Sequence, residues 1–134
     1  MKYKIILLCI SAIIISGCTN VEKQKLMIRC QDESQTIKLK GPFTDACRAA
    51  LEKFGSINTQ LLREIHINQK DSYKATFKAK DSHQYEYIIA AAGKDKKKLT
   101  ATLITTSPYK EEFLNAVYEE FNKREFEVEQ LYVE

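Results

Sequence analysis

The sequence has few of the residues that break regular structure, with four glycines, two prolines and no tryptophan in 134 residues. This scarcity excludes collagen-like chains and disordered chains rich in proline and glycine. An excess of one charge is also missing, because 21 Lys and Arg stand against 18 Asp and Glu. A polybasic protein that binds nucleic acid is therefore not indicated. The length and the 44% hydrophobic content fit a single globular domain.

Only the start of the chain is continuously apolar. Met1–Lys4 is cationic, and Ile5–Ile15 carries no charge. A run of this length is too short for a membrane span of roughly 20 residues, and it is typical of the signal peptide of an exported protein. The run ends in the four residues Ile15-Ser16-Gly17-Cys18.

These four residues resemble the lipobox of bacterial lipoproteins, in which an aliphatic and two small residues precede an obligatory cysteine. The resemblance covers residues 1–18 and implies cleavage before Cys18. It also implies that the Cys18 thiol carries acyl chains such as palmitate, and more than one chain gives stable membrane anchoring. An ordinary secretory signal peptide or an uncleaved anchor is the alternative.

The resemblance divides the chain into three parts. Residues 1–17 are the cleaved signal peptide, residues 18–24 are the lipidated cysteine with a short tether, and residues 25–134 are the domain. The expected location is the bacterial cell envelope, on the extracytoplasmic side of a membrane. Thr19 follows the cysteine where an Asp would signal inner-membrane retention, so the outer membrane is favoured if the host has one.

Two cysteines remain for the domain, because Cys9 would leave with the signal peptide and Cys18 would be acylated. Cys30 and Cys47 would then face a compartment in which disulfides persist. We expect a disulfide between them, which would stabilise the fold by about 3 kcal/mol in the chain-entropy model. Two buried free thiols are the alternative. The histidines and cysteines show no metal-binding spacing, so no metal or cofactor is expected.

Alternation and breaks predict the elements of the domain. A hairpin is expected from Leu26–Cys30 and Thr36–Lys40, followed by a helix that Thr44 caps and Gly55 ends. An antiparallel meander is expected from residues 61–68, 73–80, 84–92 and 98–106. Ser107 and Pro108 predict the start of a second helix, with Ser107 as its N-cap. Phe126–Val133 is expected to form a last strand.

This order predicts an α+β domain, an antiparallel sheet of about six or seven strands with two helices packed on one face. The expected strand contribution to the core is Leu26, Ile28, Ile37, Leu39, Tyr73, Ala75, Phe77, Ala79, Leu99, Ala101 and Leu103. The segment Leu99–Leu103, with Ser107-Pro108 and the amphipathic helix after it, faintly resembles the end of PsbP/DcrB-type lipoprotein domains. That likeness has no diagnostic motif and implies no function.

The chain offers little that could catalyse a reaction. Asp81-Ser82-His83 contains the residue types of a hydrolase triad, but three neighbours in a turn point in different directions, and turn chemistry explains Asp and Ser there. The paired glutamates of the second helix are expected to be solvated. We therefore expect a protein that is not an enzyme.

Charge layout is the better functional signal. Residues 23–98 hold 16 basic and 9 acidic side chains, whereas residues 111–134 hold 2 and 8. Six basic residues are expected on the sheet face opposite the core: Arg29, Lys38, Lys40, Lys74, Lys78 and Lys80. With a short tether, this face could contact an anionic envelope component. Lysines that are merely solvated are the alternative.

The sequence thus favours a non-enzymatic lipoprotein that binds an envelope component or a protein partner. The partner surface could also be the aromatic stretch of Tyr85 and Tyr87, unless that strand lies buried under a helix. A small carrier or sensor of an apolar ligand is the second hypothesis, and it needs an internal cavity.

Overall fold

The computed structural model describes residues 23–67, 70–94 and 97–131 of the chain. Six strands and two helices occur within these residues. In chain order they are β1 (Lys23–Cys30), α1 (Pro42–Glu52), β2 (Ser56–Ile67), β3 (Lys70–Lys80), β4 (Glu86–Gly93), β5 (Lys98–Thr105), α2 (Lys110–Lys123) and β6 (Phe126–Gln130). The predicted α+β class is confirmed. The signal peptide, Cys18 and the end of the predicted last strand lie outside the described residues.

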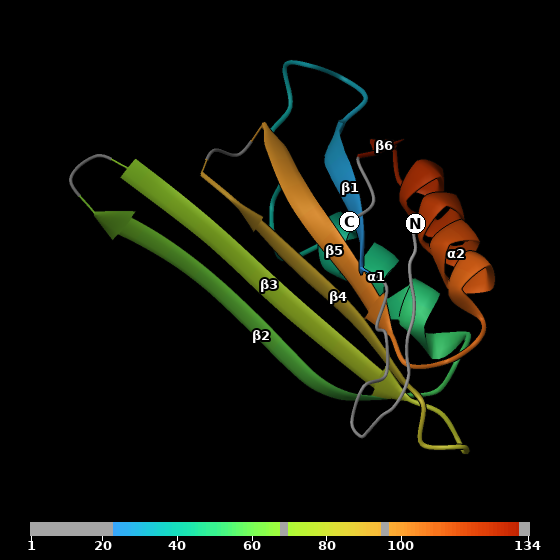
Figure 1. Cartoon of the computed structure of the whole chain (residues 1–134). Coiled ribbons are helices and arrows are strands. Elements are labelled where there is room, and N and C mark those ends of the chain that lie inside the picture. The colour runs from blue at the N-terminus through green and yellow to red at the C-terminus, as the bar shows by residue number, and fades with distance from the viewer. Residues whose placement is uncertain (1–22, 68–69, 95–96, 132–134) are drawn as a thin grey trace, which may run out of the picture.

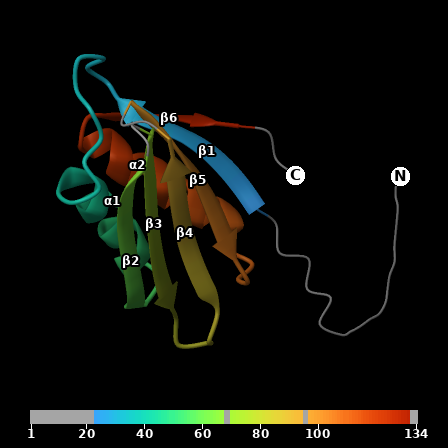
Figure 2. The same ribbon diagram turned by 90° about the vertical axis from the view of Figure 1, so that its left-hand side faces the viewer.

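The strands form one antiparallel sheet in the order β2-β3-β4-β5-β1-β6 (Figure 1). Strands β2 to β5 are neighbours in sequence and in space, so the predicted meander is confirmed. Strand β1 lies between β5 and β6, which brings the start of the domain beside its end. Both helices lie on the same face of the sheet (Figure 2).

The predicted hairpin after β1 is wrong. Residues 36–40 form no strand, and β1 pairs with β5 on one side and β6 on the other. Because both edges of β1 are occupied, no place is left for a hairpin partner. The Asp32 side chain still forms the expected turn, accepting hydrogen bonds from the N–H and hydroxyl of Ser34. Ile37 and Leu39 are buried as predicted, at 3% exposure each, from a loop that leads to α1.

Helix α1 begins two residues before the predicted cap. Gly41 is the N-cap, with a φ of 109° that favours glycine, and Pro42 is the first helical residue, where its missing N–H costs nothing. Thr44 lies within the first turn, and its hydroxyl donates to the Leu39 carbonyl. After the helix, Gly55 passes so close to β3 that a Cβ would lie 2.3 Å from the Lys80 carbonyl oxygen.

Helix α2 begins later than predicted, at Lys110, with Tyr109 as its N-cap. Ser107 is not the cap, because its buried side chain is used in the loop instead. Its hydroxyl oxygen accepts a hydrogen bond from the Tyr109 N–H at 3.1 Å and lies 3.1 Å from the Thr105 hydroxyl. The polar residues that predicted a helix start therefore satisfy the turn between β5 and α2.

The core lies between the sheet and the two helices. Every strand or loop residue expected there is buried, with an exposed fraction of 3% or less. Aromatic rings fill the centre: Phe43 of α1 lies 5.4 Å from Phe121 of α2 and 6.2 Å from Phe126 of β6, measured between ring centroids. These edge-on contacts join both helices to the edge of the sheet.

Candidate binding surface

The sheet face turned away from the helices has no described element over it (Figures 1 and 2). We call it the open face. Its residues alternate with the buried ones along each strand. Among the residues with described side chains it comprises Lys23, Lys25, Met27, Arg29, Ser72, Lys74, Thr76, Lys78, Lys80, Glu86, Ile88, Ala90, Ala92, Lys98, Thr100, Thr102, Ile104, Glu127 and Glu129.

The middle of the open face is small and apolar. Ile88 pairs with Ile104, and Ala90 pairs with Thr102, across β4 and β5. All four side chains are half-buried by their neighbours in the sheet. No charged side chain stands at these positions, so the centre of the face is an apolar strip that includes a threonine.

Lysines border this strip on both sides. The register sets Lys78 of β3 beside Ile88, and Lys23 of β1 beside Ile104. One row across four strands therefore runs from lysine through two isoleucines to lysine. Lys74 and Lys78 are exposed, as is Lys23. This pattern of apolar centre and cationic borders suits an anionic surface, to which each nearby lysine contributes about 1 kcal/mol.

Four of the six predicted contact residues lie on the open face, namely Arg29, Lys74, Lys78 and Lys80. Arg29 differs from the three lysines, because its Nε lies 2.5 Å from Glu127 Oε1 and its Nη2 lies 3.9 Å from Glu129 Oε1. These carboxylates on β6 compensate its charge.

Lys38 and Lys40 are not on the sheet, which corrects their prediction. They are exposed in the loop before α1, because the hairpin that would have carried them does not form. Lys23, Lys25 and Lys98 also belong to this face and were not among the predicted contact residues. Their alternation with Leu26 and Leu99 was the available signal, and for Lys23 it was concealed because β1 begins two residues before the expected start of the domain.

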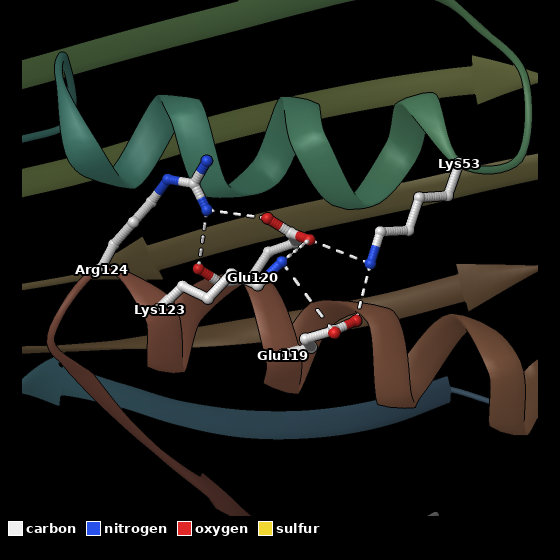
Figure 3. Close-up of polar contacts among 5 residues, drawn as sticks. All are labelled: Lys53, Glu119, Glu120, Lys123 and Arg124. Carbon is white, nitrogen blue, oxygen red and sulfur yellow. Dashed lines mark hydrogen bonds and ion pairs between the residues drawn. The ribbon is translucent and has the colours of Figure 1, made fainter.

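A cluster of paired charges lies on the helix side of the sheet, where α1 ends beside α2 (Figure 3). Glu120 is only 5% exposed, and its carboxylate lies 2.9 Å from Lys53 Nζ, 3.3 Å from Lys123 Nζ and 2.8 Å from Arg124 Nη1. Lys53 also contacts Glu119 at 2.8 Å.

Hydrogen bonds to Lys53 and then to Arg124 lower the pKa of Glu120 to about 2, against the opposing effect of burial. A carboxyl held ionised in this way is unsuited to act as a general acid or base near neutral pH. Because Lys53 comes from the end of α1 and Glu120 from α2, the cluster joins the two helices. Its role is structural.

Asp81, Ser82 and His83 form a turn and no triad. Asp81 Oδ1 accepts the backbone N–H of His83 and of Tyr85, at 2.9 and 3.0 Å, and Oδ2 accepts the Tyr87 hydroxyl at 2.9 Å. Burial opposes ionisation of Asp81, but these hydrogen bonds, led by that of Tyr87, lower its pKa. The carboxylate fixes the β3–β4 turn and has no nucleophile to activate.

Tyr87 cannot form the aromatic patch considered for a protein partner. Its side chain is 1% exposed and stacks on Phe54 with 4.7 Å between ring centroids, so this side of β4 lies under the helices. Tyr85 is half-buried at the turn, 6.3 Å from the His83 ring.

Cys30 and Cys47 are free thiols in the structure, so the predicted disulfide is not formed. The reason is the position of α1. Cys30 ends β1, between β5 and β6, whereas the strands that α1, with Cys47, contacts most are β2, β3 and β4. Burial raises the pKa of both thiols, and that of the fully buried Cys47 rises well above its usual value. Neither is an activated nucleophile.

Within the described residues, no three His, Cys, Asp or Glu side chains come together as a metal site. In the same part of the chain, no helix is long and apolar enough to cross a membrane. No family model, curated protein or solved structure matches this chain.

Proposed function

We propose that this chain is a lipid-anchored, extracytoplasmic protein of the bacterial cell envelope, not an enzyme, whose open face binds an anionic envelope component. The observation that carries the proposal is the uncovered sheet face with lysines on both sides of its apolar centre. A sheet face of this kind matches an extended anionic surface better than a small substrate, because no described element encloses it.

The position of the anchor supports the same partner. Because β1 begins at Lys23, only residues 19–22 join the lipidated Cys18 to the sheet, and four residues span at most about 14 Å when extended. The first residues of β1 include Lys23 and Lys25, which belong to the open face. Anchoring would therefore hold this face close to the membrane from which the tether extends, where two or more acyl chains provide stable attachment.

The carrier hypothesis has less support. The space between helices and sheet, where an apolar ligand would bind, is occupied by packed aromatic rings such as Phe43, Phe113 and Phe121. A carrier would need these rings to move apart, and core packing of this density opposes such movement.

Vesicle binding tests the proposal. A form that begins at Asn20, and so lacks the acyl anchor, should co-sediment with anionic vesicles more than with neutral ones. The preference should weaken as salt rises, since exposed charges are screened over roughly 8 Å at physiological ionic strength. The double variant Lys74→Glu/Lys78→Glu should lose at least fivefold in affinity.

Lys38→Glu/Lys40→Glu is the matched control, because it makes the same change of net charge at exposed lysines off the sheet. Equal losses in the two double variants would mean that overall charge, and not the open face, governs binding. Indifference of the parent form to lipid charge would refute the anionic-surface proposal.

The anchor has its own test. Cys18→Ala should abolish acylation and leave unprocessed precursor, which mass spectrometry of the N-terminus measures. A natural mature form that begins elsewhere, or that lacks lipid on Cys18, would refute the lipoprotein assignment.

A further inference from the structure

The two edges of the sheet are built differently. The β6 edge is only five residues long and carries the exposed glutamates 127 and 129. Short, charged edge strands are a usual protection against pairing with another chain. The β2 edge is twelve residues long, contains no proline and has one irregularity, between Ile57 and Thr59. In Figure 1 no described element runs along its outer side.

The hydrogen bonds and registers of the other strands indicate which backbone N–H and C=O groups of β2 point away from the sheet. The Glu86 carbonyl accepts the Thr106 N–H, so the even-numbered residues of β4 bond toward β5 and the odd-numbered ones toward β3. Even-numbered residues of β3 must then bond toward β2, where Lys74 pairs with Arg63. The backbone N–H and C=O groups that point away from the sheet are those of Gln60, Leu62, Glu64 and His66.

The β2–β3 hairpin also extends beyond the rest of the sheet. The last pair between β3 and β4 is Tyr73 with Gly93, whereas β3 starts at Lys70 and continues to pair with β2. Figure 1 shows the two strands running past the end of β4. The hairpin therefore presents an arm whose outer edge pairs with no other strand among the residues that the structure describes.

We propose that the outer edge of β2 pairs antiparallel with β2 of a second copy of this chain, which joins two sheets into one. Among the described strands, only β2 and β6 are at an edge of the sheet. A β6 strand of five residues would leave most of the twelve-residue β2 edge exposed, whereas β2 of a second copy matches it in length. Pairing between the β2 strands of two copies is related by a two-fold axis, so it gives a closed dimer and not a filament.

The geometry of such a dimer agrees with the open face. A two-fold axis between antiparallel strands of one sheet is perpendicular to the sheet, so both open faces lie on the same side. If the proposed function holds, the dimer presents a doubled cationic surface to one membrane, and binding of the two halves becomes mutually reinforcing. The dimer itself does not depend on that function, and its test uses no vesicles.

Sedimentation velocity of the full chain in mild detergent, over a range of protein concentrations, tests the pairing. The expected mass is that of two chains. Glu64→Pro removes an outward N–H without removing a bond to β3, and it should raise the dimer dissociation constant at least tenfold. Glu64→Ala is the matched control, because it keeps the N–H, and its dissociation constant should stay within threefold of the parent value.

Amide hydrogen exchange of the unaltered chain provides a second measurement that does not depend on a variant folding. The amides of Gln60, Leu62, Glu64 and His66 should exchange slowly at high protein concentration and faster on dilution, whereas those bonded to β3 should not change. A single-chain mass with concentration-independent exchange would overturn the proposal and leave the edge bare or reserved for a different protein. A dimer that resists Glu64→Pro and shows no such exchange pattern would overturn it too.

Discussion

Strand β4 presents similar side chains to two very different environments. Tyr87, Ile89 and Ala91 point under the helices and are at most 3% exposed. Ile88 and Ala90 point to the open face and are half-buried only by their neighbours in the sheet. An aliphatic residue therefore does not by itself identify the covered side of such a strand. Whether a helix covers that face of the sheet decides whether the residue is part of the core or of the surface.

The difference also separates stability from binding. The covered face is held by interlocking aromatic rings and by the Lys53–Glu120 contact between the helices. The open face contributes few contacts beyond the sheet itself, so it can change without unfolding the protein. Substitutions on the two faces should consequently differ both in size and in what they affect.

The largest expected effect is that of removing a central ring. Phe43 is fully buried and contacts Phe77, Phe121 and Phe126, so Phe43→Ala leaves a cavity that several elements share. We expect a loss of about 4 kcal/mol in the free energy of unfolding. Urea denaturation measures it, and a loss below about 1 kcal/mol would show that this ring is not central to the core.

A sharper comparison uses neighbours on one strand. Ile89→Ala deletes fully buried methyl groups and should cost about 3 kcal/mol. Ile88→Ala makes the same chemical change on the open face and should cost about 1 kcal/mol, because the site is half-buried and adjoins solvent. Equal losses in urea denaturation would mean that the open face is covered in solution, as a tightly associated partner would do.

The ion-pair cluster around Glu120, which joins α1 to α2, should be sensitive to acid. The pKa of Glu120 is about 2 in the folded protein and lies near 4.5 for an unperturbed glutamate, so the folded state favours the ionised form. The resulting stabilisation is fully present above pH 4.5 and is lost as the pH falls from 4.5 toward 2. Its size is on the order of 3 kcal/mol, because each pKa unit between the two values corresponds to about 1.4 kcal/mol.

Glu120→Gln should remove most of that acid sensitivity and lower stability at neutral pH. Glu119→Gln is the matched control, because Glu119 contacts the same Lys53 but is 56% exposed, and it should change the pH profile little. Thermal denaturation between pH 2 and pH 7 measures both variants. A parent-like profile for Glu120→Gln would mean that other carboxyl groups govern acid unfolding.

Much of the fold could be predicted because burial of one face of a strand or helix makes apolar residues recur at regular intervals in the sequence. The alternation of β3 and β5 and the apolar stripe of α2 predicted elements and core residues together. Ile37 and Leu39 show the limit of that signal: both are buried, as their alternation indicates, yet they belong to a loop. Alternation therefore indicates which residues are buried, but it does not indicate which segments pair as strands.

Long-range pairing decided what the sequence could not show. No local pattern indicates that β1 inserts between β5 and β6, and this insertion removed the hairpin, moved Lys38 and Lys40 off the sheet, and separated Cys30 from Cys47. The ion-pair cluster around Glu120 was not predicted for the same reason, because Lys53, which contacts Glu120, is distant from it in sequence. The adjacent basic residues at 123 and 124 were the only local hint.

The smallest expected effect on stability is that of charge reversal on the open face. Lys74 and Lys78 are exposed, and their β4 neighbours Ala92 and Ile88 are uncharged, so glutamate at either position meets no like charge across that pair. Lys74→Glu/Lys78→Glu should change the free energy of unfolding by no more than about 0.5 kcal/mol per site. Urea denaturation of this variant measures its effect on stability, and vesicle binding of the same variant measures its effect on contact with an anionic surface. A stability loss above about 2 kcal/mol would mean that these lysines hold the fold, and a loss of binding could then no longer be assigned to the open face.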